Sequence, residues 1–308
     1  MPIPTGNEVK WWTSSEAREY ARCPQRWAYL YLHRRRGVGV GQALTRGIAF
    51  HAAVATQMHR LKDGLAADPD ALRADILTSL GDVEAGTLRD AKAIANYTAT
   101  WLTEATLPWD KVVDVEVPLE RPKEVEPHIQ IPPLRGILDA VVTRGDKTWV
   151  LDWKTVGASV PVATYLAQFR RGPQATGYTY LAQGAYPNVA GFILILVRCL
   201  AAKTKTGDVR TWRDAIEVVD LSISPDVQSL GLATLNRTWM AMKNARKGHL
   251  HGRPFEQRGL LTGACSGDHG NSLCPFLDVC EGRLDILDDL YFTDHDPNAR
   301  YQPDGGEI

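Results

Sequence analysis

Apolar residues recur with helical spacing through most of the first third of the chain, which predicts helices there. Thr13 and Glu16 are three residues apart and fit a capping box. They open an amphipathic stretch that runs to Leu32, with Pro24 as a break. Further helices are expected over residues 44–65, 70–80 and 84–107.

From Val112 onward, short runs rich in Val, Ile and Leu replace the helical pattern and favour strands. The predicted strands cover residues 112–119, 137–143, 148–153, 192–199 and 211–221. Helices are predicted between and after them, over residues 174–183 and 226–247. Strands that alternate with helices indicate an α/β layer fold.

The composition and charge of the chain exclude some classes of protein but do not indicate a function. The chain has 308 residues, 44% of them hydrophobic, which is enough to bury a substantial core. Its net charge of -1 gives no overall attraction to nucleic acid, so such contacts would depend on local basic clusters. The longest apolar run, near 191–197, is too short to cross a membrane, and the N-terminus lacks the pattern of a secretory signal. We therefore expect a cytoplasmic protein with no membrane partner.

The segment from 136 to 155 holds the most informative pattern. A two-residue turn at Gly145-Asp146 would pair the flanking strands so that partner numbers sum to 291. Asp139 would then lie opposite Asp152, with Lys154 two residues further on the same face. The other face would be an apolar wall formed by Leu138, Ala140, Val142, Trp149, Leu151 and Trp153.

Two carboxylates placed opposite each other repel unless a cation lies between them. Oxygen ligands select Mg²⁺ or Mn²⁺, and such ions leave positions for water and a substrate phosphate. The ammonium of Lys154 would contact the attacking water or the transition-state phosphate. Asp139, Asp152 and Lys154 are thus candidate catalytic residues for phosphodiester hydrolysis. The alternative is that all three are solubilising charges on an edge strand.

These residues resemble the PD-(D/E)XK nuclease superfamily, and in particular its RecB-like branch, which includes CRISPR adaptation nucleases and the AddB nuclease domain. Gly136-x-x-Asp139 and Asp152-Trp-Lys154 resemble that branch's second and third motifs. The resemblance implies metal ligands at His51, Asp139 and Asp152 and the main-chain carbonyl of Trp153, and substrate-binding residues at Gln174 and Tyr178.

Taken alone, each further match has a structural explanation. His51 would simply hydrogen-bond within a helix pair, and Gln174 and Tyr178 would be an exposed and a half-buried residue on one helical face. Glu116 resembles a recurrent strand acid of the branch, or is an outward strand charge.

The resemblance also implies the fold, a restriction-endonuclease-like mixed central sheet flanked by helices, with the N- and C-terminal segments joined at a cysteine cluster. The expected nuclease core covers residues 36–257. Residues 1–35 together with 258–293 would form a cluster-binding cap, and 294–308 a loose polar tail.

Four of the five cysteines are candidate cofactor ligands. Cys265, Cys274 and Cys280 lie close together in sequence in a polar, glycine-rich segment, and Cys23 lies far upstream. Four thiolates bind either Zn²⁺ or an iron-sulfur cluster, and spacing does not separate the two. The RecB-like resemblance implies a 4Fe-4S cluster, with Zn²⁺ as the alternative. Cys199 ends an apolar run and is expected to be a buried thiol.

The expected function is that of a Mg²⁺- or Mn²⁺-dependent DNA exonuclease. By the same resemblance it would act on single-stranded DNA or free ends in recombination, repair or CRISPR adaptation, with an integrase or a helicase as partner. One alternative is a noncatalytic iron-sulfur or zinc subunit that binds DNA or serves as a scaffold. Another is a zinc protein with an unrelated α/β core.

Overall fold

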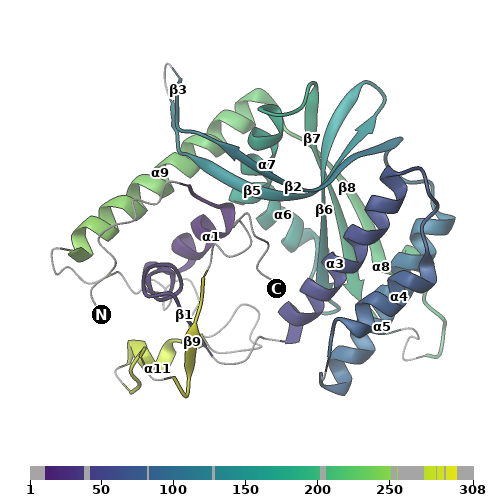
Figure 1. Ribbon diagram of the computed structural model, residues 1–308, viewed down its shortest axis with the longest axis horizontal. Coiled ribbons are helices and arrows are strands. Elements are labelled where there is room, and N and C mark those ends of the chain that lie inside the picture. Colours follow the sequence, from purple (N-terminus) through teal and green to yellow (C-terminus); the bar gives the residue numbers. More distant parts are fainter. Residues whose placement is uncertain are drawn as a thin grey trace. The chain divides into compact units, whose positions relative to one another are not determined.

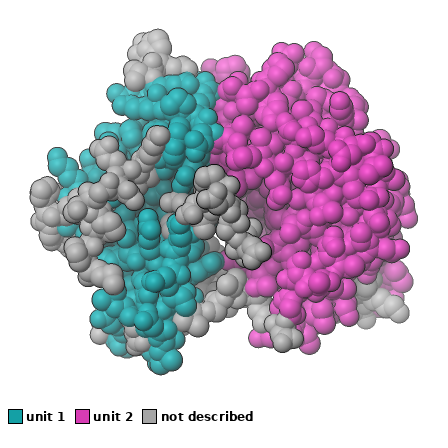
Figure 2. Space-filling model, in the orientation of Figure 1, with its two compact units in different colours: residues 1–39, 120–135, 229–308 teal, residues 40–119, 136–228 magenta. Residues whose placement is uncertain are grey.

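The computed structural model describes residues 11–37, 42–81, 83–126, 129–201, 206–250, 255, 274–281, 283–287 and 289–296. The chain forms two compact units. Unit 1 comprises residues 1–39, 120–135 and 229–308, and unit 2 comprises residues 40–119 and 136–228 (Figure 2). In the described part of the chain, no helix is long and apolar enough to cross a membrane.

Unit 2 is built on a five-stranded sheet with the order β2-β5-β6-β7-β8. β5 and β6 pair antiparallel, β6 and β7 parallel, and β7 and β8 antiparallel, so the sheet is mixed. The predicted mixed α/β fold is confirmed. The strands are β2 (Lys111–Arg121), β5 (Leu134–Arg144), β6 (Lys147–Gly157), β7 (Val189–Cys199) and β8 (Ile216–Ser222).

Helices cover both faces of this sheet (Figure 1). On one face, Ile193 of β7 belongs to a hydrophobic core that includes Phe50 and Ile94 from the helices. On the other face, the ring of Phe192 lies 5.3 Å from that of Phe169. Alternation along β7 thus separates two helical layers. The first is α3 (Gln42–Lys62), α4 (Pro69–Thr78) and α5 (Ala85–Glu104), and the second is α6 (Val162–Arg171) and α7 (Pro173–Gln183).

The predicted strand over 211–221 is wrong at its start. Residues Trp212–Ala215 form the short helix α8, and the strand β8 begins only at Ile216. Thr211 and Asp214 form a capping box, which satisfies the first N–H groups of a helix and so favours the turn over a strand. The helix α6 was not predicted from the sequence.

In unit 1, the first predicted helical stretch breaks at Pro24, as predicted, and changes to a π-helix at Ala28, which was not predicted. It comprises α1 (Ser14–Arg22), α2 (Pro24–Trp27) and the π-helix η1 (Ala28–Leu32). β1 (Arg35–Gly37) pairs with β9 (Phe292–Asp294), so Asp294 ends a strand, although the sequence placed it in the tail. The unit also contains β3 (Glu124–Glu126), β4 (Ile129–Ile131), α11 (Leu277–Cys280) and most of α9 (Pro225–Leu250).

Only half of the predicted capping box at the start of α1 is present. The side chain of Thr13 accepts the N–H of Glu16, but Glu16 accepts a hydrogen bond from Nε1 of Trp27 at 3.1 Å. Glu16 is 5% exposed. Burial raises its pKa to about 7, although the bond from Trp27 and the charges of Arg135 and Arg246 act in the opposite direction.

The stability of the protein should therefore fall as pH rises through the range in which Glu16 ionises. The carboxyl group titrates near 4.5 when unfolded and near 7 when folded, so ionisation favours the unfolded chain above 4.5. The unfolding free energy of Glu16→Gln minus that of wild type should increase by about 2–3 kcal/mol as the pH is raised from about 5 to about 8, as measured by urea denaturation. Exposed Glu120 supplies the control Glu120→Gln, and equal pH profiles for the two variants would contradict the prediction.

Candidate active site

Asp152 lies at the centre of the candidate site. It is fully buried on β6, and its Oδ1 accepts a hydrogen bond of 2.8 Å from Nε2 of Gln174 on α7. Nζ of Lys154 lies 2.5 Å from Oδ2 of Asp152. Because Lys154 is two residues further along the strand, the two side chains share the face covered by α6 and α7. Asp152 and Lys154 are therefore close together, as the sequence predicted.

Asp139 reaches the site from the neighbouring strand, but not by direct cross-strand pairing. The turn at Gly145-Asp146 sets the predicted register, with Ala140 opposite Leu151, and the ladder ends at that pair. Beyond it, the N–H of Trp153 donates to Oδ2 of Asp139 at 2.9 Å. The predicted register is confirmed, but the predicted pair Asp139–Asp152 is not part of the ladder.

The alternation of side chains along β5 also changes at this point. Ile137 and Asp139 line a cavity beneath α3, whereas Ala140 and Val142 belong to the core on the same side of the sheet. Odd and even positions face the same side only if the alternation shifts by one between Asp139 and Ala140. The predicted apolar wall shared by Leu138 and Ala140 is therefore wrong, and the two carboxylates approach each other from different faces.

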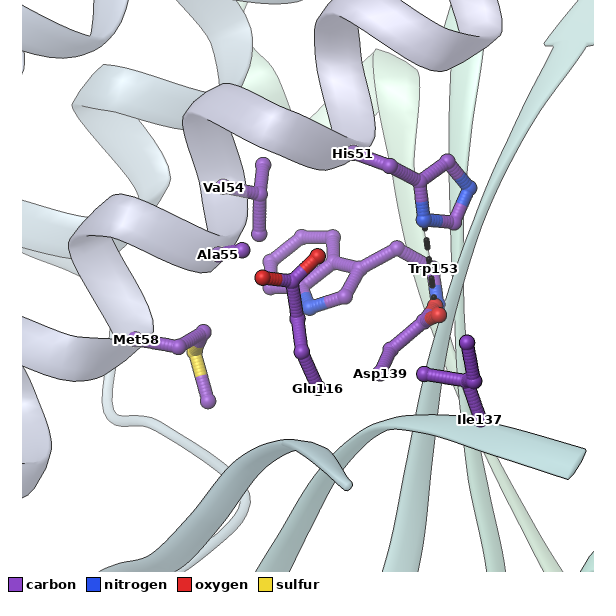
Figure 3. Close-up of a pocket in the computed structure, with 8 residues that line it drawn as sticks. All are labelled: His51, Val54, Ala55, Met58, Glu116, Ile137, Asp139 and Trp153. Carbon is purple, nitrogen blue, oxygen red and sulfur yellow. Dashed lines mark hydrogen bonds and ion pairs between the residues drawn. The ribbon is translucent and has the colours of Figure 1, made fainter. Parts of the chain in front are cut away.

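His51 projects from α3 toward Asp139, and its Nδ1 lies 3.2 Å from Oδ2 of Asp139 (Figure 3). Both residues line a cavity of about 40 Å³ together with Glu116 of β2. The backbone of Glu116 has a φ of 49°, in the left-handed region, although β2 continues through it, and its exposed side chain lies at the cavity on the side facing α3 (Figure 3). A volume of this size suits an ion with a water, because a water occupies about 30 Å³ in the liquid.

Charge is unevenly distributed over these groups. Burial raises the pKa of Asp152 to about 6, and the nearby charge of Asp139 acts in the same direction. Burial also acts to raise the pKa of Asp139, but His51, Lys154 and the N–H of Trp153 outweigh it and lower that pKa. Burial acts to lower the pKa of Lys154, yet the two carboxylates raise it overall. The site therefore combines the ammonium of Lys154 with two carboxyl groups of opposite behaviour: the pKa of Asp139 is lowered and that of Asp152 is raised.

The side chains of the site carry the oxygen and nitrogen donor atoms that a hard divalent cation binds. They include two carboxylates, an imidazole and, on Glu116, a third carboxylate. Oδ2 of Asp152 is buried and contacts Nζ of Lys154, and a carboxylate oxygen has a second lone pair that such an ion could use. Within the described ranges, no three His, Cys, Asp or Glu side chains already converge as a ready metal site. In the present arrangement Lys154 is the cation beside Asp152.

Gln174 and Tyr178 lie on the same helix, α7, but have different surroundings. Gln174 contacts Asp152 directly, which makes it part of the acidic site. Tyr178 is 6% exposed and packs against the backbone of Gly136. A Cβ at Gly136 would lie 2.8 Å from Cε1 of Tyr178, so glycine is required for this close approach. The glycine and the tyrosine thus fix α7 against the strand that bears Asp139.

Comparison with known families agrees with this geometry. A sequence model of the PD-(D/E)XK nuclease superfamily matches residues 12–281. The chain belongs to this superfamily. No curated protein matches the chain. Membership in the PD-(D/E)XK superfamily implies a nuclease, and it rules out the alternative of a zinc protein with an unrelated α/β core.

The described cysteines of this PD-(D/E)XK chain lie in unit 1, except for Cys199. Cys23 is buried, while Cys274 and Cys280 are half-buried, and all are free thiols. Tyr29 of η1 hydrogen-bonds with Cys280 and lies close to Cys23. Nη1 of Arg26 lies 3.9 Å from Sγ of Cys274. These three cysteines therefore lie around α2 and η1.

Two cysteines need separate comment. Cys265 lies outside the described residues. Cys199 is 4% exposed within the hydrophobic core of unit 2, as predicted, and burial raises its pKa to about 11.

Two features of the site were not assigned from the sequence. The sequence left Glu116 open between a strand acid of the site and an outward charge, because a two-residue alternation cannot anticipate a left-handed residue within a strand. The direct bond from Gln174 to Asp152 was not anticipated either. The four-residue spacing of Gln174 and Tyr178 identified the helical face but not its distance from the sheet.

Proposed function

We propose that this nuclease is a metal-dependent DNA exonuclease that hydrolyses phosphodiester bonds at single-stranded ends. The observation that supports it most directly is the buried carboxylate of Asp152, which contacts the half-buried side chains of Lys154 and Gln174 and has Asp139 beside it. Resemblance of the motifs to the RecB-like branch supports action on ends, in recombination, repair or CRISPR adaptation, with an integrase or a helicase as partner.

His51, Asp139, Asp152 and the main-chain carbonyl of Trp153 would hold Mg²⁺ or Mn²⁺, and Glu116 offers a further carboxylate. Such an ion supplies Lewis-acid polarisation of the scissile phosphate. Nζ of Lys154 would donate a hydrogen bond to the attacking water or to a phosphate oxygen, which stabilises the charge that develops there. Gln174 holds Asp152 in place through its hydrogen bond to Oδ1. The cavity is far smaller than the roughly 300 Å³ of a ligand pocket, so the nucleotide itself would lie outside it.

Nucleotide release from end-labelled DNA in the presence of Mn²⁺ or Mg²⁺ tests this function. Linear single strands, strands blocked at the 5′ end or at the 3′ end, and circular DNA should be compared. An exonuclease should release mononucleotides or short products from linear strands, should be stopped by one of the two blocks and should leave circles intact. Cleavage of circles would show an endonuclease, and absence of metal-dependent cleavage would favour the noncatalytic alternative.

We further propose that Cys23, Cys265, Cys274 and Cys280 hold a 4Fe-4S cluster in unit 1. Three of these thiols lie around the helical segment formed by α2 and η1. The role expected for the cluster is structural, since it would tie the two ends of the chain together.

Anaerobic purification should yield a brown protein with broad absorbance near ~400 nm, as expected for a cysteine-ligated iron-sulfur cluster. Cys274→Ser should lose this absorbance and about four irons per chain, whereas the core variant Cys199→Ser should retain both. Stoichiometric zinc without iron would contradict the assignment and support Zn²⁺ instead.

A further inference from the structure

The second half of α9, in unit 1, is rich in basic residues. From Ser229 to Leu250 the sequence contains Arg237, Lys243, Arg246 and Lys247 and no acidic residue. The inner side of this helix is apolar, with Leu235 and Met242 buried. Arg237, Lys243 and Lys247 are exposed, so the solvent side of α9 carries positive charge. Figure 1 shows the length of this helix.

Two lysines converge on one indole at this face. Nζ of Lys243, one turn beyond Trp239, lies 4.8 Å from the centre of its ring. Nζ of Lys123, from the segment between β2 and β3, lies 5.9 Å from the same ring. Both lysines are exposed and Trp239 is half-buried. Lys247, one further turn along, continues the same exposed face.

Two neighbouring arginines lie beside acidic residues, whereas these two lysines have no ion pair in the described part of the chain. Arg121 pairs with Glu124 at 2.8 Å, and Arg246 lies near Glu16. Among the residues that the structure describes, neither Lys123 nor Lys243 forms an ion pair. Contacts between an ammonium and an aromatic ring are weak at exposed sites, and two like charges at one ring repel. Folding alone therefore gains little from this arrangement, whereas a phosphate would neutralise it.

We propose that Lys123, Trp239, Lys243 and Lys247 form a binding surface for single-stranded DNA. The lysines contact phosphates, and Trp239 stacks against a base, the combination by which proteins hold single strands without sequence preference. The proposal rests on the proposed function, since the bound strand is a segment of the nuclease's own substrate. It assigns single-strand binding to residues of unit 1, in addition to the acidic residues of unit 2 proposed to cleave the strand.

Binding of fluorescein-labelled oligo(dT) of about 20 nucleotides, followed by fluorescence anisotropy in EDTA, tests this surface without cleavage. Lys123→Gln/Lys243→Gln should weaken binding at least about tenfold at low salt and reduce the slope of log K against log salt by about 1.4, or 0.7 for each phosphate contact. The matched control Lys92→Gln/Lys147→Gln removes two exposed lysines of unit 2 and should change affinity less than about threefold.

Substitutions of Trp239 test the contribution of base stacking separately from that of charge. Trp239→Leu should weaken binding at least about fivefold, whereas Trp239→Phe, which keeps an aromatic face, should remain within about threefold of wild type. Thermal unfolding must show each variant folded. Equal affinities for the two double-lysine variants, or no oligo(dT) binding by wild type, would overturn the proposal. Wild-type protein that binds through this surface but never cleaves DNA would overturn the proposed function alone.

Discussion

Asp152→Asn should reduce the rate of DNA cleavage at least about a thousandfold while the protein remains folded. The substitution keeps the shape of the side chain and an oxygen that can accept the hydrogen bond from Gln174. It removes the charge that pairs with Lys154 and that the proposed metal ion requires. The loss should therefore appear in kcat, measured with Mn²⁺ on end-labelled DNA.

Stability should change much less than activity in this variant. Breaking a fully buried ion pair costs about 3–5 kcal/mol, but the side chain of Lys154 is 21% exposed and retains Asp139 nearby. We expect a loss of about 1–2 kcal/mol of unfolding free energy. Asp146→Asn, in the exposed turn of the same hairpin, is the matched control and should keep full activity. An Asp152→Asn variant that retains a tenth of wild-type activity after rigorous purification would refute the catalytic assignment.

The hairpin of β5 and β6 shows how much of this site could be predicted from the sequence. A glycine-containing turn with alternating strands on both sides fixes a register, and the register observed is the predicted one. Local rules sufficed because the pairing involves neighbouring residues. The same rules placed Asp152 and Lys154 on one face of β6, whereas Asp139 comes close to them from the other face.

What the sequence did not reveal depends on departures from regular strands. The β5–β6 pairing ends at Ala140, and the alternation of side chains along β5 shifts by one residue there. The carboxylate of Asp139 accepts a hydrogen bond from the N–H of Trp153. These features arise from tertiary contacts, such as the approach of Tyr178 to Gly136, which no local period encodes. The left-handed backbone of Glu116 is of the same kind.

Trp153→Ala should be among the most destabilising single substitutions in unit 2. The indole is 1% exposed, and its ring lies 6.0 Å from Phe50 and 5.5 Å from Trp101. Removing a buried Trp side chain leaves a cavity and costs about 3–5 kcal/mol, as measured by urea denaturation. Trp153→Phe should cost less, since it fills most of the space and removes an indole N–H that has no partner in the described structure.

Trp149 allows the effect on stability to be separated from the effect on the site. It lies on the same strand and the same face as Trp153, is also buried, and is near the turn rather than near Asp139. Trp149→Ala should lower stability but preserve the cleavage rate per folded molecule. Trp153→Ala keeps the main-chain N–H that binds Asp139 and the carbonyl proposed as a metal ligand, but it removes the indole packing that holds this backbone in place, so it should lower both. Equal rates per folded molecule in the two alanine variants would show that packing of this indole does not position the acidic site.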